Sequence, residues 1–422
     1  MLSSQLQCLA RRHLLATSRV AVLSSKRLFS ANDDSVTPAR TALYDFHVAQ
    51  RGKIVNFGGY LLPVQYADQG IVASHLHTRQ HASIFDVSHM LQTYVHGKDA
   101  IACMESICTA DIASAAAGSG SLTVFTNEQG GILDDLIVMK VSSDMLYVVS
   151  NAAMKQQDMA IMEAAVSHYK AQGKNVSIEF QSSSEQSLIA VQGPNAVSSL
   201  SRLTSEKHVN LSQLYFMNTK VTEVAGVPDC RITRCGYTGE DGVEISIPSS
   251  KVRHVIEALL NADNQIKMAG LGARDSLRLE AGLSLYGSDI DAKTTPIEAA
   301  LAWLVAKRRR AELNFPGAKL ICEQLKTGVT KRRIGLELID SSSPPARAGV
   351  QIYKNDKQVG HITSGCPSPS LGRNIAMGYI AEQLKAPGEP VWLKIRNKLY
   401  AAKVTKMPFV PTKYYLKPKS HK

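Results

Sequence analysis

The sequence has no hydrophobic run of the length that a membrane helix needs, and it contains no C-x-x-C pair. A long apolar stretch, residues 299–306, is far shorter than the ~20 residues of a membrane-spanning helix. The 7 cysteines are odd in number, which argues against a disulfide scaffold or a zinc ribbon. We therefore predict no transmembrane segment, and we expect reduced thiols.

Nucleotide-binding and metalloprotease motifs are also missing. The Gly118–Gly120 stretch lacks the third glycine of a dinucleotide-binding fingerprint, and no P-loop occurs. His77 and His81 have the i, i+4 spacing of a helical metal pair, but no H-E-x-x-H pattern completes it. We interpret these two histidines, together with His75 and His89, as polar or packing residues, and we expect no metal.

Acidic residues are absent from the first 30 residues, which carry five basic residues and many Ser, Leu and Ala. That composition is typical of a mitochondrial transit peptide. Removing these five positive charges would lower the formal net charge from +12 to +7. Nucleic-acid binding is the alternative interpretation of the charge, but aromatic residues are not interleaved with basic ones along a stripe. We predict a transit peptide at residues 1–30 and no nucleic-acid partner.

Strand-like and helix-like segments mix without a strict alternation up to about residue 310. In the predicted helix Lys155–Lys170, Met159, Met162, Ala165 and Val166 recur at helical spacing. Further helices are predicted at Lys251–Asn261 and Ala273–Glu280, and strands at Lys53–Phe57, Leu122–Thr126, Ile132–Lys140, Met145–Ser150, Ser187–Val191 and Val243–Ile247.

From about residue 328 onward, short strands follow one another closely. Turn residues separate them at positions 354–357, 387–388 and 397–398. This spacing predicts a small all-β sandwich or barrel, with a boundary near residues 327–330. Its predicted strands are Arg333–Ile339, Val350–Tyr353, Val359–Ser364, Asn374–Ile380 and Val391–Ile395.

Two adjacent carboxylates, Asp134 and Asp135, interrupt the apolar strand at residues 132–138. Side chains alternate faces on a strand, so the two point in opposite directions, each between apolar neighbours. A carboxylate against an apolar surface is costly and has a perturbed pKa, which makes catalysis one interpretation. A structural pair that caps a turn or meets an arginine is the other.

Two further clusters contain charged residues beside Gly-rich or helical segments. Glu244 follows a Gly-punctuated loop, residues 236–242, and either faces solvent or serves a site. Arg274 and Arg278 lie one helical turn apart, so they share a face. A guanidinium there suits a carboxylate or a carbonyl-rich heterocycle, but a surface ion pair is the alternative.

Two basic runs, residues 307–310 and 331–333, flank the predicted domain boundary. Such runs usually form a solvated face. They are also suited to an acidic partner or to the glutamate tail of a folate.

Taken together, these segments resemble the T-protein (aminomethyltransferase) family of the glycine cleavage system. The resemblance extends from about Thr41 to Lys417 and is specific because its motifs occur in this order. They are residues 43–66, 75–92, 130–138, 189–194, 233–246, 273–291, 363–371, 376–379 and 406–415.

The resemblance implies an α+β fold with two interleaved ferredoxin-like units at residues 41–310. A C-terminal β-barrel at residues 328–418 completes a three-domain cloverleaf, with folate in the central channel. The implied reaction moves the methylene carbon of S-aminomethyldihydrolipoyl H-protein to tetrahydrofolate. Its products are 5,10-methylenetetrahydrofolate, ammonia and dihydrolipoyl H-protein, and no metal is needed.

The same resemblance implies a place, partners and site residues. The place is the mitochondrial matrix, the direct partner is lipoylated H-protein, and the P- and L-proteins are further members of the system; no membrane partner is expected. Asp135 matches the catalytic residue, acting as a base or as an electrostatic stabiliser. The residues that match folate-binding positions are Glu244, Arg274, Tyr414, Met90 and Tyr237.

Two other functions remain open from the sequence. One is a folate-linked demethylase module, which the missing dinucleotide fingerprint disfavours. The other is a non-catalytic folate-binding or iron–sulfur maintenance protein of the same fold, which the carboxylates Asp134 and Asp135 and any dependence of activity on H-protein would distinguish.

Overall fold

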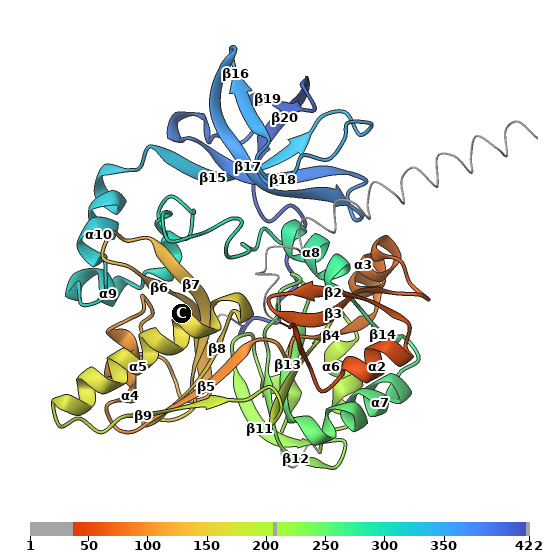
Figure 1. The fold of residues 1–422 in the computed structure, drawn as a ribbon, viewed down its shortest axis with the longest axis vertical. Helices are drawn as coiled ribbons and strands as arrows, with labels where there is room; N and C mark the ends of the chain where they lie inside the picture. Colours follow the sequence, from red (N-terminus) through yellow and green to blue (C-terminus); the bar gives the residue numbers. More distant parts are fainter. Residues whose placement is uncertain (1–36, 206–208, 419–422) are drawn as a thin grey trace, which may run out of the picture.

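The computed structural model describes residues 37–205 and 209–418 and has three lobes (Figure 1). The predicted transit peptide, residues 1–30, lies outside the described residues. Within the described part, no helix is long and apolar enough to cross a membrane. Two lobes are sheets covered by helices, and the third is a barrel.

The first sheet has the spatial order β6-β7-β8-β5-β9 and is antiparallel throughout. Its strands are β5 (Leu91–His96), β6 (Ser119–Thr126), β7 (Ile132–Lys140), β8 (Met145–Ser150) and β9 (Ser177–Gln181). Helices α4 (Ala100–Glu105) and α5 (Lys155–Ala171) cover one face. Met162, Ala165 and Val166 of α5 are buried in the core between helix and sheet, as their helical spacing predicts.

The second sheet has the order β11-β12-β13-β10-β4-β14. Its strands are β4 (Ala82–Asp86), β10 (Gln186–Gln192), β11 (Thr219–Val224), β12 (Val227–Thr233), β13 (Gly242–Pro248) and β14 (Ile266–Met268). The helices of this lobe are α2 (Tyr44–Ala49), α3 (Ile71–Gln80), α6 (Ala196–Ser201) and α7 (Val252–Ala262). Val255, Ile256 and Leu259 of α7 are fully buried in its core.

The two sheets are interleaved along the chain. The chain leaves the second sheet after β4, builds all five strands of the first sheet, and returns at β10. Each sheet contains a strand, a helix, three strands, a helix and a strand in succession, which is a ferredoxin-like β-α-β-β-α-β unit with one added strand. In the second sheet, β4 takes the place next to β10, and β14 pairs with β4 at the edge. Phe85, Tyr147 and Leu188 pack together between the sheets, against Leu277 of α8 (Leu271–Glu280), so the units share a core. The predicted interleaved α+β fold is confirmed.

Smaller elements complete these lobes. The strands β1 (Ala39–Arg40), β2 (Gly52–Phe57) and β3 (Tyr60–Tyr66) form a three-stranded sheet of order β1-β3-β2. Helix α8 contacts β3, α3 and the barrel, so it lies where the lobes meet. The helices α9 (Lys307–Glu312) and α10 (Ala318–Thr327) precede the barrel.

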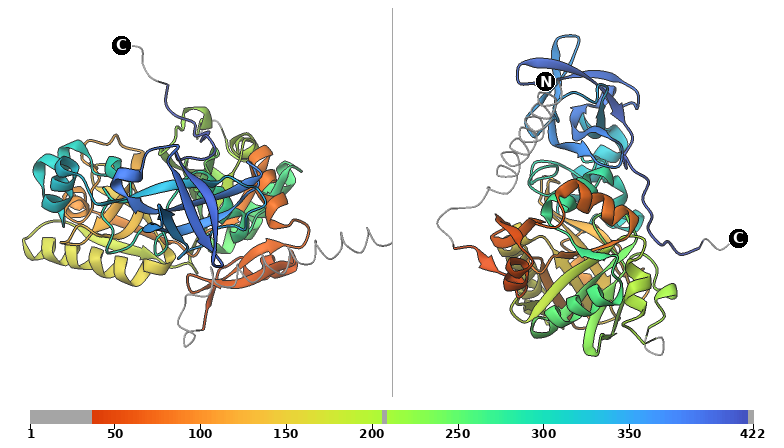
Figure 2. Two further views of the ribbon diagram at one scale, coloured as in Figure 1. Left: turned by 90° about the horizontal axis from the view of Figure 1, so that it is seen from above. Right: turned by 90° about the vertical axis from the view of Figure 1, so that its right-hand side faces the viewer.

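The C-terminal lobe is a closed barrel of order β15-β18-β17-β16-β19-β20. Its strands are β15 (Lys331–Leu338), β16 (Gln351–Lys354), β17 (Lys357–Ser368), β18 (Arg373–Ala381), β19 (Pro390–Ile395) and β20 (Lys398–Thr405). The sequence analysis predicted the first five and missed β20, whose two central alanines weaken the strand pattern. β20 pairs with both β15 and β19 and so closes the barrel. From residue 406 the chain runs back from the barrel, past the end of α8, to loops of the second sheet (Figure 2).

Candidate active site

A cavity of about 1170 Å³ lies where the three lobes meet. Its walls come from β7, β13, α8, β15, the long connection after α8 and the C-terminal segment. It is large enough for a drug-sized ligand with room to spare. The six residues that the family resemblance assigned to the site all line it: Met90, Asp135, Tyr237, Glu244, Arg274 and Tyr414.

The carboxylates of Asp134 and Asp135 lie on opposite faces of β7, as strand alternation predicts. Asp135 is partly exposed on the cavity wall, whereas Asp134 is fully buried behind the strand. Burial and the neighbouring Asp134 raise the pKa of Asp135 to about 7. The raised pKa agrees with the perturbed carboxylate that the sequence analysis expected on this strand.

Asn151, which directly follows β8, fixes both carboxylates. Its backbone N–H donates to Oδ2 of Asp134 at 3.0 Å, and its side-chain Nδ2 donates to Oδ1 of Asp134 at 2.9 Å. The same Nδ2 lies 3.0 Å from Oδ1 of Asp135 and 2.9 Å from its carbonyl oxygen. The sequence analysis missed Asn151 because a lone Asn after a strand looks like an ordinary turn residue.

A third carboxyl group, that of Asp158 on α5, lies behind Asp134 and is also fully buried. Burial raises the pKa of Asp134 to about 9 and that of Asp158 to about 6. The two groups therefore hold one proton between them through neutral pH. Helical spacing placed residue 158 on the first turn of α5, but only the packing of α5 on the sheet brings it to β7.

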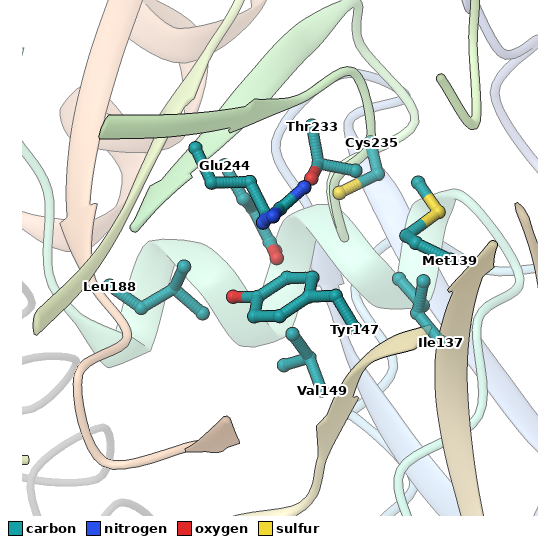
Figure 3. Close-up of a pocket in the computed structure, with 9 residues that line it drawn as sticks. Ile137, Met139, Tyr147, Val149, Leu188, Thr233, Cys235 and Glu244 are labelled. Atoms are coloured by element: carbon teal, nitrogen blue, oxygen red, sulfur yellow. The ribbon is translucent and has the colours of Figure 1, made fainter. Parts of the chain in front are cut away.

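Glu244 projects from the face of β13 opposite the core residues Val243 and Ile245. That face turns toward the first sheet and the cavity, not toward open solvent. A recess of about 10 Å³, room for about one water molecule, adjoins Glu244 between the sheets (Figure 3). In this recess Glu244 and Cys235 lie on one side of the Tyr147 ring and Val149 on the other. Burial raises the pKa of Glu244, which Arg274 and Cys235 partly oppose.

Arg274 reaches the cavity from α8. Its guanidinium lies over the ring of Tyr237, 4.9 Å from the centroid. The hydroxyl of Tyr237 donates to the carbonyl oxygen of Ser284, which fixes the ring. Nη1 of Arg274 is buried and has no hydrogen-bond acceptor among the described residues. A buried donor without an acceptor is costly, so this atom points to a ligand group that accepts a hydrogen bond.

Arg278, one turn further along α8, does not join the site. It is fully buried and binds Asp289 at 2.6 Å and Asp275 at 2.9 Å. It also donates to the carbonyl oxygen of Leu283 and to the hydroxyl of Ser364 in the barrel. Of the two alternatives in the sequence analysis, the ion pair therefore holds for Arg278. The pair is buried, not on the surface as that alternative had it.

The remaining predicted residues contribute apolar or aromatic surface. Tyr414 stacks on Phe216, with ring centroids 4.2 Å apart, and burial raises its pKa to about 12. Met90 packs at the edge of the core between the sheets. His89, also on the cavity wall, was not predicted for the site. Burial and Arg274 lower its pKa to about 3, so it is neutral.

The arginines of the two basic runs bind acceptors within the chain. Arg308 pairs with Glu105, Asp111 and Glu312. The other arginines of the first run, 309 and 310, donate to backbone carbonyl oxygens. In the second run, the side chains of residues 332 and 333 also line the cavity. Neither run is a free basic face.

The histidines of residues 75–81 have structural contacts. His75 is buried and binds Ser276 and Glu280, whereas the rings of His77 and His81 lie side by side, with centroids 4.9 Å apart. Among residues 37–205 and 209–418, no group of three or more His, Cys, Asp or Glu side chains is placed to hold a metal ion.

Two family models match the chain and together cover most of it. The model described as "GCVT N-terminal domain" matches residues 43–309. The model described as "Glycine cleavage T-protein C-terminal barrel domain" matches residues 331–411. The site thus lies between the two segments that define this class of three-lobed protein.

Curated relatives and a solved structure agree with this assignment. The chain is 51% identical over 377 residues to "Aminomethyltransferase, mitochondrial" of Homo sapiens, covering 89% of this chain and 91% of that protein. It is 48% identical over 397 residues to the protein of the same name of Gallus gallus, with coverages of 94% and 98%. The crystal structure of glycine cleavage system aminomethyltransferase T from Bartonella henselae superposes with a TM-score of 0.81 at 37% identity, covering 89% of this chain and 99% of that one.

The chain therefore belongs to the glycine cleavage T-protein family, and its function is that of an aminomethyltransferase of the glycine cleavage system. The family suggested by the sequence motifs is confirmed.

Proposed function

We propose that the chain uses tetrahydrofolate as acceptor and lipoylated H-protein as donor of the one-carbon unit. The observation that carries this proposal is the cavity between the lobes. Asp135, Glu244 and Arg274 all line it, and Nη1 of Arg274 has no hydrogen-bond partner among the described residues. A hydrogen-bond acceptor, a hydrogen-bond donor and a titrating carboxyl group thus meet in one cavity.

The chemistry of these groups fits a reduced pterin. The carboxylate of Glu244 can accept two parallel hydrogen bonds, which suits the amino group and the ring N–H of the pterin. Nη1 of Arg274 lacks an acceptor, which the pterin carbonyl oxygen would supply. The aromatic surface of Tyr237 and Tyr414 suits a flat heterocycle.

The transfer requires that two protons leave the folate nitrogens and reach the two leaving groups. The donor carries S–CH2–NH3+, and two N–H bonds of tetrahydrofolate are replaced by N–C bonds to that carbon. The C–S and C–N bonds of the donor break. Of the two protons that leave the folate nitrogens, one ends on the dihydrolipoyl sulfur and the other on ammonia.

Asp135 is suited to carry one of these protons. With a pKa near 7, it can take up a proton at neutral pH and release it again. We assign it to proton transfer, with electrostatic stabilisation as a secondary effect while it is ionised. The cavity adds proximity, since it would hold the two reactants around one carbon atom.

The setting follows from the relatives and from the sequence. We assign the protein to the mitochondrial matrix, since the relatives are named mitochondrial and residues 1–30 have the composition of a transit peptide. H-protein would be the direct partner, with the P- and L-proteins as system members. The matched segments support a division into residues 41–310 and 328–418.

The decisive experiment mixes the purified protein with aminomethylated H-protein, with and without tetrahydrofolate, and measures ammonia. We expect rapid ammonia release only when tetrahydrofolate is present, with 5,10-methylenetetrahydrofolate formed in equal amount. Tight folate binding without any release would instead identify a non-catalytic folate-binding protein.

A further inference from the structure

The C-terminal segment, residues 406–418, has no helix or strand, yet it forms part of the cavity wall. It leaves the barrel after β20 and runs back past the end of α8 to loops of the second sheet (Figure 2). Four of its residues line the cavity: Lys406, Met407, Pro408 and Tyr414. Because the segment lacks regular secondary structure, specific contacts must hold Tyr414 in place.

The backbone of this segment is attached at only a few points. The N–H groups of Phe409 and Val410 donate to the carbonyl oxygen of Glu280 at the end of α8. Further along, the N–H of Lys413 donates to Gly239 at 2.8 Å, and the carbonyl oxygen of Tyr415 accepts from Phe216 at 2.8 Å. The last two bonds flank Tyr414.

Two aromatic stacks reinforce this attachment, one at Tyr414 and one at Tyr415. Tyr414 stacks on Phe216 with an interplanar angle of 17°. Its neighbour Tyr415 stacks on Tyr215, with centroids 5.5 Å apart and an angle of 13°. Consecutive residues of the tail thus pair with consecutive residues of the loop. The Tyr414–Phe216 pair lines the cavity, whereas the Tyr415–Tyr215 pair lies outside its lining.

Arg234 completes the contact to Tyr415. Its guanidinium is buried and binds Asp241 through Nε at 2.9 Å and through Nη2 at 2.5 Å. Nη1 donates to the carbonyl oxygens of Leu211 and Leu214. These in-plane bonds fix the group and leave its face free, and the Tyr415 ring lies over that face at 4.0 Å.

We propose that Arg234, Tyr215 and Tyr415 form a clamp that holds the C-terminal segment against the cavity, and that Tyr415 is a positioning residue for tetrahydrofolate binding. The clamp acts through Tyr414, whose ring it holds on the cavity wall before the ligand arrives. This role rests on the proposed use of tetrahydrofolate. Without the clamp, the ligand would have to order the segment on binding, which weakens affinity and leaves the chemical step intact.

The test compares Tyr415→Ala with the wild type in the ammonia assay. We expect the KM for tetrahydrofolate to rise about tenfold with kcat within about twofold. Tyr415→Phe keeps the ring and should restore the wild-type KM, since it loses only the exposed bond to the Ser212 carbonyl oxygen. Leu416→Ala, at an exposed neighbouring position, is the matched control and should change nothing.

A second readout does not depend on folate. Trypsin cleaves after Lys413, and the clamp should protect the bond between residues 413 and 414. We expect faster cleavage there in Tyr415→Ala than in the wild type, Tyr415→Phe or Leu416→Ala. An unchanged KM together with unchanged cleavage would overturn the clamp, as would a loss of kcat at constant KM. If the wild type released no ammonia with tetrahydrofolate, the proposed function would be wrong. The rate of trypsin cleavage after Lys413 would still test the clamp by itself.

Discussion

Arg274 and Arg278 lie one turn apart on the same helix, and their surroundings differ in one respect. Arg278 binds two carboxylates, a carbonyl oxygen and a hydroxyl, all from this chain. Arg274 lies over an aromatic ring and keeps a buried N–H group without an acceptor. A buried guanidinium with its full set of partners holds lobes together, whereas an incomplete set at a cavity wall marks a binding position.

The same contrast separates Asp134 from Asp135. Asp134 is buried behind β7, where Asn151 and Asp158 complete its surroundings. Asp135 shares the hydrogen bond from Asn151 but opens onto the cavity. Strand alternation thus turns one carboxylate inward and the other toward the cavity. We assign the first to the architecture and the second to the proposed proton transfer.

The strongest test of this division is Asp135→Asn. We expect it to bind tetrahydrofolate normally and to lose about 10²- to 10⁴-fold in turnover, because an amide cannot exchange the proton. Ammonia release measures turnover, and calorimetry measures binding. Asp144→Asn, an exposed carboxylate at the far end of the β7–β8 hairpin, should behave as wild type. Near-normal transfer by Asp135→Asn would remove Asp135 from the mechanism.

On the architectural side, the largest effect is expected from Arg278→Met. It would leave Asp289 as a buried carboxylate without its cation, at a cost of about 3–5 kcal/mol in the free energy of unfolding. Urea denaturation measures this. Arg253→Met, which breaks an exposed pair with Glu257 on α7, should cost about 1 kcal/mol or less. Equal losses from both variants would contradict the structural role of Arg278.

Arg274→Met, in contrast to Arg278→Met, should impair tetrahydrofolate binding and leave the stability of the fold nearly unchanged. Methionine retains apolar contact with Tyr237 and removes a buried donor that has no protein partner, so the free energy of unfolding should change little. The KM for tetrahydrofolate should rise about 10- to 100-fold, since a charged hydrogen bond contributes about 1.5–3 kcal/mol. A destabilised protein with unchanged KM would place Arg274 in the same class as Arg278.

Local patterns singled out the strand of Asp134 and Asp135, whereas Met90, Tyr237 and Tyr414 were expected only from the family resemblance. Strand alternation separated Asp134 from Asp135, and the bounds of β7 and β8 agree with the prediction. Asn151 and Asp158 were missed because their roles depend on long-range packing of β8 and α5 against β7. Likewise, helical spacing placed Arg274 and Arg278 on one face of the helix. Only the tertiary fold shows that Asp289 and Ser364 bind the guanidinium of Arg278.

The smallest expected effect is a pH dependence of the wild type. The pKa of Asp135 is raised to about 7, so the carboxylate predominates above this pH and the neutral acid below it. If the carboxylate accepts the proton, kcat/KM should level off above about pH 7 and fall about tenfold per pH unit below it. At pH 7 itself the loss is only about twofold.

His89 is the histidine on the cavity wall, and burial and Arg274 lower its pKa to about 3, well below the expected inflection. His89→Gln should therefore keep the inflection at the wild-type pH, whatever its absolute rate. An inflection that vanished in this variant would transfer the titrating role from the carboxylate of Asp135 to the imidazole. Proton exchange would then occur at the Arg274 end of the cavity, and the division between Asp134 and Asp135 would lose its chemical meaning.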